Sequence, residues 1–295
     1  MRLKLEGIWT PIPTPLTKNG RVDTDATRRL VDFHIGAGID GLLPLGTSGE
    51  FALLSREERK ALVGAVVDQA DGRVPVVAGV SDPSIESVVQ LSSDSKEAGA
   101  DAVIATPPYY FTTTDEGHYH HFKTISEAID LPLMIYNIPE WTHSFVTPET
   151  VQRLAEEKLV VGMKYTEYNF LNLLRFLKTS GTKIAIFAGS DAMAYSNLEF
   201  GGSGAIIGSA NVAPKVASEI FDDYKKGDLE GARESQEKLL PIIMALGVGK
   251  YPAALKEAMS LIGMPVGPLK EPLQQLSIDE KKMVAGLLRS GGFLR

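Results

Sequence analysis

The stretch from Leu159 to Thr166 reads Leu-Val-Val-Gly-Met-Lys-Tyr-Thr. This apolar run is rich in valine and too short for a helix, so it predicts a buried strand. Lys164 lies at the end of that strand. Burial of an unpaired ammonium costs several kcal/mol and favours the neutral amine, which attacks carbonyl groups. Lys164 is therefore a candidate nucleophile, and the alternatives are a buried ion pair or a head group that escapes to solvent.

Seven similar runs accompany this stretch along the chain, and segments with helical spacing of apolar residues alternate with them. The expected strands span residues 7–10, 41–45, 74–80, 101–106, 132–137, 159–164, 183–188 and 204–208. The expected helices span residues 23–35, 55–70, 84–98, 115–129, 147–157, 191–200 and 215–226. Strict alternation with short links predicts a parallel sheet. Eight strands predict a closed (β/α)8 (TIM) barrel, with an open doubly wound sheet as the alternative.

The rest of the chain indicates a helical extension. We expect the barrel in residues 1–225 and a C-terminal extension packed on it in residues 226–295, with helices over 232–246, 253–262 and 277–288. A length of 295 residues suits one such unit, because these barrels need roughly 250 residues.

Composition restricts the partners and the cell compartment. The net charge of −7 argues against nucleic acid or an anionic membrane as a partner. The chain has no cysteine, which excludes disulfides and thiolate chemistry. No signal-like segment opens the sequence, and no apolar run approaches the roughly 18 residues of a membrane span. We therefore expect a cytoplasmic protein.

Several reactive side chains lie where predicted strands end. Lys164 and Tyr136 end two strands, Thr47 and Ser48 follow a third, and Tyr110 follows a fourth. The carboxyl ends of barrel strands form one mouth, so these groups should meet there. A lysine imine with a 2-keto acid needs a proton carrier such as Tyr136, and hydroxyls can bind the carboxylate. The alternatives are a core tyrosine and a glycine-rich turn that serves only the backbone.

Six short motifs carry a family resemblance. They are Gly46-Thr47-Ser48-Gly49-Glu50, Pro108-Tyr109-Tyr110, Tyr136-Asn137-Ile138-Pro139, Gly162-Met163-Lys164, Gly189-Ser190-Asp191 and Gly204-Ala205-Ile206. In order and spacing the chain resembles the class I aldolases of the dihydrodipicolinate synthase and N-acetylneuraminate lyase superfamily, from about residue 7 to residue 294.

The resemblance implies roles for individual residues. Lys164 would form the Schiff base with pyruvate, Tyr136 would transfer protons, and Thr47 and Ser48 would bind the pyruvate carboxylate. Tyr110 would be lent across a dimer interface, within a homotetramer built as a dimer of dimers. The covalent lysine imine would replace any cofactor or metal.

Two departures from the family pattern bear on the second substrate. The synthases have an arginine, which holds the aldehyde's carboxylate, where this chain has Trp141. The sialic acid lyases have a glutamate where this chain has Ala192. The remaining resemblance is to 2-keto-3-deoxy sugar acid aldolases, which cleave such acids reversibly to pyruvate and a short aldehyde. The expected substrate-binding residues beyond the pyruvate site are Thr166, Asp191, Ile206, Trp141 and His143, although Asp191 could instead cap the following helix.

Other functions stay open at this point. One is the synthase reaction, which condenses pyruvate with aspartate semialdehyde, and another is dehydration of a 2-keto-3-deoxy acid. A metal-dependent aldolase would need ligands such as His118, His120 and His121, which we instead expect at a solvated helix start. A non-catalytic keto-acid sensor and a glycine-rich phosphate site near the eighth strand are further alternatives.

Overall fold

The computed structural model describes residues 3–294 and contains one sheet of eight parallel strands. The strands are β1 (Gly7–Thr10), β2 (Gly41–Leu42), β3 (Val77–Gly79), β4 (Ala102–Ala105), β5 (Leu133–Asn137), β6 (Gly162–Tyr165), β7 (Ala185–Ala188) and β8 (Gly204–Ile206). They pair in the order β2-β1-β8-β7-β6-β5-β4-β3. A parallel bridge between Leu42 and Val76 joins the two ends of this order. The sheet is thus a nearly closed barrel, which confirms the (β/α)8 prediction over the open sheet.

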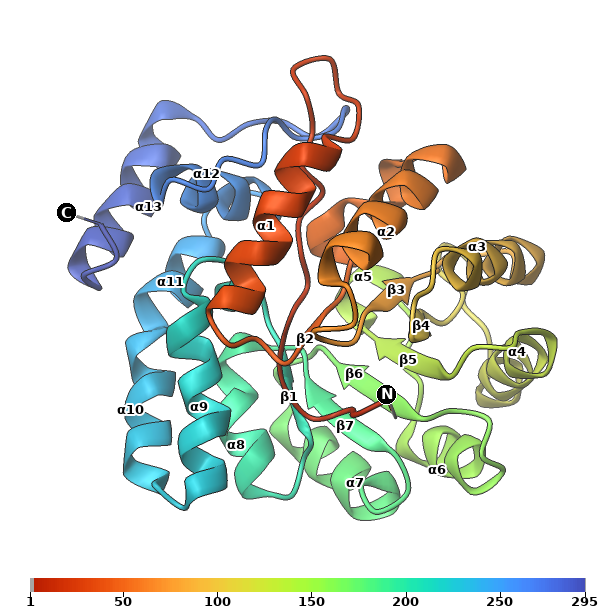
Figure 1. Cartoon of the computed structure of the whole chain (residues 1–295). Helices are drawn as coiled ribbons and strands as arrows, with labels where there is room; N and C mark the ends of the chain where they lie inside the picture. Colours follow the sequence, from red (N-terminus) through yellow and green to blue (C-terminus); the bar gives the residue numbers. More distant parts are fainter. Residues whose placement is uncertain (1–2, 295) are drawn as a thin grey trace.

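Helices surround the strands (Figure 1). The main helices are α1 (Thr24–Gly36), α2 (Arg56–Ala70), α3 (Ile85–Glu97), α4 (Asp115–Ala128), α6 (Pro148–Glu156), α7 (Phe170–Ser180), α8 (Ala194–Glu199) and α9 (Pro214–Lys226). Shorter elements follow several strands: η1 (Thr47–Gly49), η2 (Phe51–Leu53), α5 (Pro139–Thr142), η3 (Asp191–Met193) and η4 (Gly208–Asn211). The extension holds α10 (Leu229–Lys238), α11 (Leu240–Leu246), α12 (Ala253–Leu261) and α13 (Ile278–Ser290).

Side chains fill the inside of the barrel. An inner cluster of buried residues includes Trp9, Met134, Tyr136 and Phe187. The rings of Trp9 and Phe187 meet edge to face with centroids 5.6 Å apart. A side chain at Gly41 would meet the Trp9 indole, since an ideal Cβ there lies 2.3 Å from a Trp9 ring carbon. The interior is therefore a packed core, and only its mouth is available for chemistry.

Local sequence signals set several helix ends as predicted. The Ser55 hydroxyl accepts a hydrogen bond from the Glu58 N–H, and the Glu58 side chain accepts one from the Ser55 N–H, which is the capping box at α2. Thr147 caps α6 ahead of Pro148, also as predicted.

Three helical predictions need correction. Helix α7 was not predicted, although its apolar residues at 170, 173, 174 and 177 have helical spacing. The predicted helix over 232–246 is two helices that meet at Leu239, because Pro241 has no backbone N–H and suits only a first helical turn. The predicted helix over 191–200 begins instead as the 3-10 turn η3.

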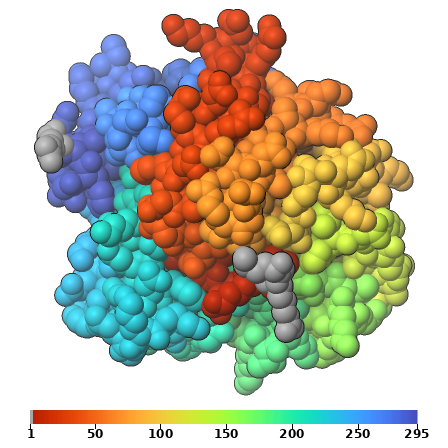
Figure 2. All heavy atoms as spheres, in the orientation of Figure 1, coloured from red at the N-terminus to blue at the C-terminus, as the bar shows by residue number. Residues whose placement is uncertain are grey.

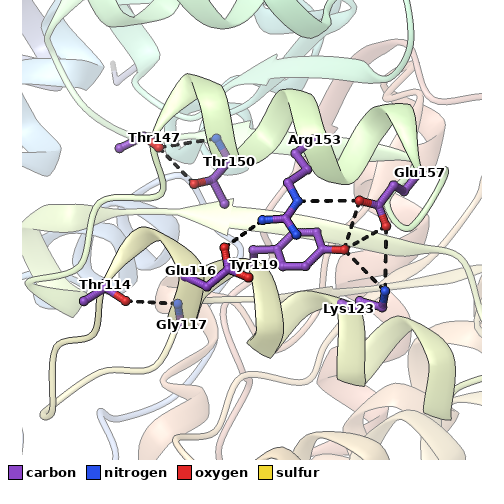
Figure 3. Close-up of polar contacts among 9 residues, drawn as sticks. All are labelled: Thr114, Glu116, Gly117, Tyr119, Lys123, Thr147, Thr150, Arg153 and Glu157. Atoms are coloured by element: carbon purple, nitrogen blue, oxygen red, sulfur yellow. Dashed lines mark hydrogen bonds and ion pairs between the residues drawn. The ribbon is translucent and has the colours of Figure 1, made fainter.

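Contacts between α4 and α6 hold the outside of the barrel near the strands that carry Tyr136 and Lys164. Figure 3 shows the Tyr119 ring of α4 between the side chains of Arg153 and Glu157. The Arg153 guanidinium lies 3.3 Å from the ring centroid, and the Tyr119 hydroxyl donates to Glu157. Arg153 also pairs with Glu116 at 2.7 Å. These contacts fix two neighbouring helices with one buried aromatic ring.

The C-terminal extension packs against the barrel and the N-terminal segment. Figure 2 shows the extension, in blue, beside the red segment that includes α1. The Leu16 N–H donates to the Val266 carbonyl at 3.0 Å, and Lys270 donates to the Gly20 carbonyl at 2.9 Å. The predicted division at residues 225 and 226 falls in the last turn of α9 and stays a prediction. None of the helices described within residues 3–294 has the length and apolar character to span a membrane.

Candidate active site

Neighbouring strands bring Lys164 and Tyr136 together. The two residues are register partners on β6 and β5, so their side chains leave adjacent strands at the same level. The Lys164 Nζ donates to the Tyr136 hydroxyl at 3.2 Å and lies 4.4 Å from the centre of its ring. The Lys164 residue is only 4% exposed. Among the described residues Tyr136 is the hydrogen-bond partner of this amine, which argues against the alternative of a structural ion pair.

The turn η1 adds hydroxyl groups to the same mouth. The Thr47 and Tyr136 hydroxyls lie 3.1 Å apart, which extends the contact to a series of three groups from Lys164 to Thr47. The Ser48 hydroxyl lies 2.6 Å from the hydroxyl of Tyr251, which precedes α12. Sequence reasoning missed Tyr251, because no local pattern connects it to a turn 203 residues earlier in the chain.

Gly189 leaves space for the side chains of Lys164 and Thr166. An ideal Cβ at Gly189 would lie 1.9 Å from the Thr166 Oγ1 and 3.0 Å from the Lys164 Cε. The Thr166 Oγ1 is buried and has no hydrogen-bond partner among the described residues. A substrate hydroxyl could supply that partner, because buried polar groups are usually satisfied.

A cavity of 640 Å³ opens at this mouth. The predicted site residues other than Tyr110 and His143 line it: Thr47, Ser48, Tyr136, Trp141, Lys164, Thr166, Asp191 and Ile206. A second, mostly apolar cavity of 320 Å³ adjoins it and shares Thr47, Trp141 and Tyr251. Residues from five different strand-to-helix units therefore form one continuous site at the mouth, as their positions at strand ends predicted.

The structure answers the alternative left open for Asp191 and corrects the prediction for His143. The Asp191 carboxylate accepts hydrogen bonds from the Ser209 N–H at 2.5 Å and the Gly208 N–H at 3.4 Å. It therefore caps η4 across the mouth rather than the helix that follows it. His143 is exposed and does not line the cavity, so its assignment to the tail pocket was wrong.

Tyr110 also lies apart from the site in a single chain. Its side chain is 85% exposed, and its backbone has a φ of 75°. A positive φ is uncommon for a tyrosine, and a bulky side chain in that conformation usually marks a special position. The neighbouring Phe111 is 76% exposed, and the two rings meet edge to face.

Two of the three histidines on α4 are buried rather than solvated. His118 and His121 are each 3% exposed, which corrects the prediction of a solvated helix start for them, whereas His120 is exposed as expected. Burial lowers the pKa of His121 to about 4, and its Nε2 lies 3.2 Å from the Thr106 carbonyl oxygen. Within residues 3–294 no group of three potential metal ligands comes together. The two buried histidines therefore serve the packing of α4.

Comparisons with known proteins agree with this geometry. A model of the Dihydrodipicolinate synthetase family matches residues 4–290. A Parvibaculum lavamentivorans protein named 4-hydroxy-tetrahydrodipicolinate synthase is 38% identical over 289 residues, which are 98% of this chain and 99% of that protein. The protein of the same name from Thermodesulfovibrio yellowstonii is 34% identical, over 98% of this chain and 99% of its own.

Solved structures are similar over the whole chain. YagE, a family member from E. coli K12 solved in complex with pyruvate, has a TM-score of 0.94 at 32% identity and covers 98% of this chain and 99% of its own. The pyruvate complex of the Acinetobacter baumannii synthase has a TM-score of 0.95 at 30% identity and covers 99% of this chain and all (100%) of its own. These relatives are carbon–carbon lyases of the class I aldolase type. This chain therefore belongs to the dihydrodipicolinate synthetase family and is an enzyme of that type.

Proposed function

We propose that Lys164 forms an imine with the keto group of pyruvate and that the enzyme makes or breaks a carbon–carbon bond at the pyruvate methyl carbon. The observation that carries this proposal is the series of contacts from the Lys164 amine through the Tyr136 phenol to the Thr47 hydroxyl. An amine next to a phenol and a hydroxyl has both a nucleophile and a route for protons. The cavity in front of these groups leaves room for a second substrate.

The steps follow from those positions. The neutral Nζ adds to the keto carbon of pyruvate, and the Tyr136 hydroxyl gives a proton to the oxygen that becomes the carbinolamine hydroxyl. The nitrogen returns its extra proton to the Tyr136 phenolate. Tyr136 then protonates the carbinolamine hydroxyl, which leaves as water and gives the iminium, and the iminium withdraws electrons from the methyl carbon. The Tyr136 phenolate takes a methyl proton, which gives the enamine, and the enamine carbon attacks an aldehyde whose oxygen takes that proton back. Water then releases the product from Lys164, and the reverse steps cleave an aldol. Thr47 is positioned to pass protons to and from Tyr136, and Ser48 with the N–H groups of η1 would bind the carboxylate.

Reduction with borohydride tests the imine. Incubation with pyruvate and borohydride should place an adduct on the peptide that contains Lys164, as read by intact mass and peptide mapping. Lys164→Met should abolish the adduct. Lys250→Met is the matched control, because Lys250 lines the same cavity but is exposed at its outer part, and this variant should keep the adduct. A folded wild-type protein without an adduct would overturn the proposal.

Aspartate semialdehyde is the second substrate that the comparisons support best, because the reported relatives carry the synthase name. It carries a carboxylate beside an ammonium group, and the carboxylate needs a cation in the cavity. Trp141 stands at the position of the synthases' arginine, so the candidate that remains is Lys250. Condensation of pyruvate with this aldehyde should then depend on Lys250, and Lys250→Met should raise the KM for the aldehyde about tenfold or more.

The other candidate for the second substrate is an uncharged, hydroxylated aldehyde, and the charges that line the cavity favour it. Glu140, Glu167 and Asp191 line the cavity together with the half-exposed Trp141. Carboxylates accept hydrogen bonds from hydroxyls and repel the carboxylate of aspartate semialdehyde. This charge pattern supports cleavage of a 2-keto-3-deoxy sugar acid, or its dehydration.

A substrate panel separates these reactions. The wild-type enzyme is assayed with aspartate semialdehyde plus pyruvate, and with 2-keto-3-deoxy acids for release of pyruvate or of water. Trp141→Arg should improve the semialdehyde reaction and impair the sugar-acid reaction. If Trp141→Arg leaves the cleavage of every hydroxylated acid unchanged, then Trp141 does not contact the substrate tail.

Assembly is a further part of this proposal, supported by the exposed Tyr110 and Phe111. Tyr110 would reach the site of a second copy in a dimer, and two dimers would form the tetramer. Mixing Lys164→Met chains with Tyr110→Ala chains should restore activity, because a mixed dimer holds one site with both residues intact. Each variant alone is the control, and failure of mixed dimers to regain activity would assign Tyr110 to its own chain or to no site.

A further inference from the structure

The segment that leads into α12 lies against the turn η1 at the mouth of the barrel. The Tyr251 hydroxyl from this segment lies 2.6 Å from the Ser48 hydroxyl. Tyr251 also lines both cavities at the mouth. Burial raises the pKa of the Tyr251 phenol, so it stays neutral and able to donate.

A second contact joins the same two parts of the chain one helical turn later. The Lys256 Nζ lies 2.5 Å from the Glu50 Oε1, and their side chains are 2% and 0% exposed. Lys256 also donates to the carbonyls of Thr14 at 3.0 Å and Pro268 at 2.7 Å. The other Glu50 oxygen accepts from the Lys270 N–H at 2.6 Å. The C-terminal extension thus surrounds the Glu50 carboxylate.

Glu50 is the residue that ends η1. Its backbone has a φ of 56°, and its N–H donates to the Thr47 carbonyl at 3.1 Å. A left-handed glutamate is strained unless its surroundings hold it, and here the ion pair with Lys256 does so. The position of Thr47 and Ser48 therefore depends on Glu50, and the position of Glu50 depends on the extension.

We propose that Tyr251 and Lys256 are positioning residues for the substrate carboxylate, an inference that rests on the proposed function. Tyr251 donates to the Ser48 oxygen and so turns the Ser48 proton toward the carboxylate. Lys256 holds Glu50 and thereby keeps the N–H groups and hydroxyls of η1 at the depth of the Lys164 amine. The extension would then help to position the groups that bind pyruvate, in addition to its packing against the barrel.

A comparison of pyruvate with its methyl ester isolates the carboxylate. Both carry the keto group, but only pyruvate carries the charge that η1 would bind. In borohydride trapping, Tyr251→Phe should raise the half-saturation concentration for pyruvate about tenfold and leave that for methyl pyruvate within about twofold, since Ser48 is then no longer oriented to donate to the carboxylate. The maximal trapping rate with pyruvate should change little, because Lys164 and Tyr136 keep their contact.

Matched variants separate this role from general packing. The measured ratio is the half-saturation concentration for pyruvate divided by that for methyl pyruvate. Tyr168→Phe removes a phenol hydroxyl that lines the same cavity without a contact to Ser48, and it should leave this ratio unchanged. Ser48→Ala should reproduce the Tyr251→Phe ratio, and the double variant should show no further loss. Lys256→Met should raise this ratio as well, and Glu50→Gln in the same chain should reverse part of the rise, because the buried charge is then gone.

The outcomes distinguish this inference from the function on which it rests. If the wild-type enzyme forms an adduct with pyruvate and Tyr251→Phe leaves the ratio unchanged, the positioning role is overturned and the lysine imine stands. If the wild-type enzyme forms no adduct with either compound, the proposed function fails and this inference fails with it. A rise of the ratio in Tyr251→Phe and Ser48→Ala but not in Tyr168→Phe supports the inference.

Discussion

Gly189 has a measurable consequence for the position of the reactive amine. An added Cβ there would lie 1.9 Å from the Thr166 Oγ1, 2.9 Å from the Thr166 Cβ and 3.0 Å from the Lys164 Cε. Rotation of the threonine side chain moves its oxygen but not its Cβ, so the backbone at Thr166, directly after β6, must also move, as must the lysine side chain. Ordinary contact begins at 3.4 Å, which requires shifts of about 0.5 Å for Thr166 and about 0.4 Å for Lys164.

Gly189→Ala should therefore lower activity as well as stability, and the enzyme should lose activity while it is still folded. Overpacking of this kind costs about 1–3 kcal/mol of folding free energy. Displacement of a catalytic group by up to about 1 Å costs up to about 10²-fold in rate, so we expect kcat/KM to fall about 10-fold to 100-fold. Steady-state pyruvate turnover measures the loss of kcat/KM, and urea unfolding measures the loss of folding free energy.

Two controls accompany this variant. Gly64→Ala lies in α2, where an added Cβ has no neighbour within 4 Å, so it should leave the rate unchanged and raise stability by about 0.4–1 kcal/mol. Thr166→Ala in the Gly189→Ala background removes the closest clash and should restore part of the borohydride adduct. If Gly189→Ala keeps the wild-type kcat/KM, then the Lys164 side chain can shift without loss of activity, and the reasoning is refuted.

Three further results are expected. Tyr136→Phe should reduce kcat about 10²-fold to 10⁴-fold, seen in single-turnover kinetics, and an unchanged rate would mean that another group carries the protons. Burial lowers the pKa of His34 to about 3, so the unfolded chain takes up a proton below about pH 6.5 while the folded chain does not. Stability should then be complete above pH 6.5 and fall by about 1.4 kcal/mol per unit below it, or about 2 kcal/mol at pH 5. Urea unfolding at pH 7 and pH 5 measures this loss, and His34→Gln should reduce the difference; an identical difference would contradict it. EDTA should leave pyruvate turnover unchanged, and a loss reversed by a divalent metal would reinstate a metal-dependent reaction.

Local signals carried most of the fold and the inner part of the site. The capping box at Ser55, the proline after Thr147 and the buried runs of the strands act over a few residues, and the structure shows each of them. The placement of Lys164 and Tyr136 also needed only the rule that parallel strands end at one mouth. What a residue does within its own strand or helix was therefore predictable.

Contacts between distant segments were not predictable in the same way. The burial of His118 depends on how α4 rests on the barrel, which its own sequence does not specify. Asp191 had two local interpretations, and its actual partners lie on η4, after the next strand. Tyr251 and Lys256 reach η1 across about two hundred residues, so a single sequence held no signal for them.

The contacts of the extension with η1 also give the enzyme an order of maturation. Ribosomes make a chain from its amino end, so all eight strands emerge before Tyr251 and Lys256 do. A nascent chain with its strands complete would hold the Lys164 amine but would lack both side chains that secure η1. Keto acids would meet a competent carboxylate site only after translation had passed α12 and that helix had docked.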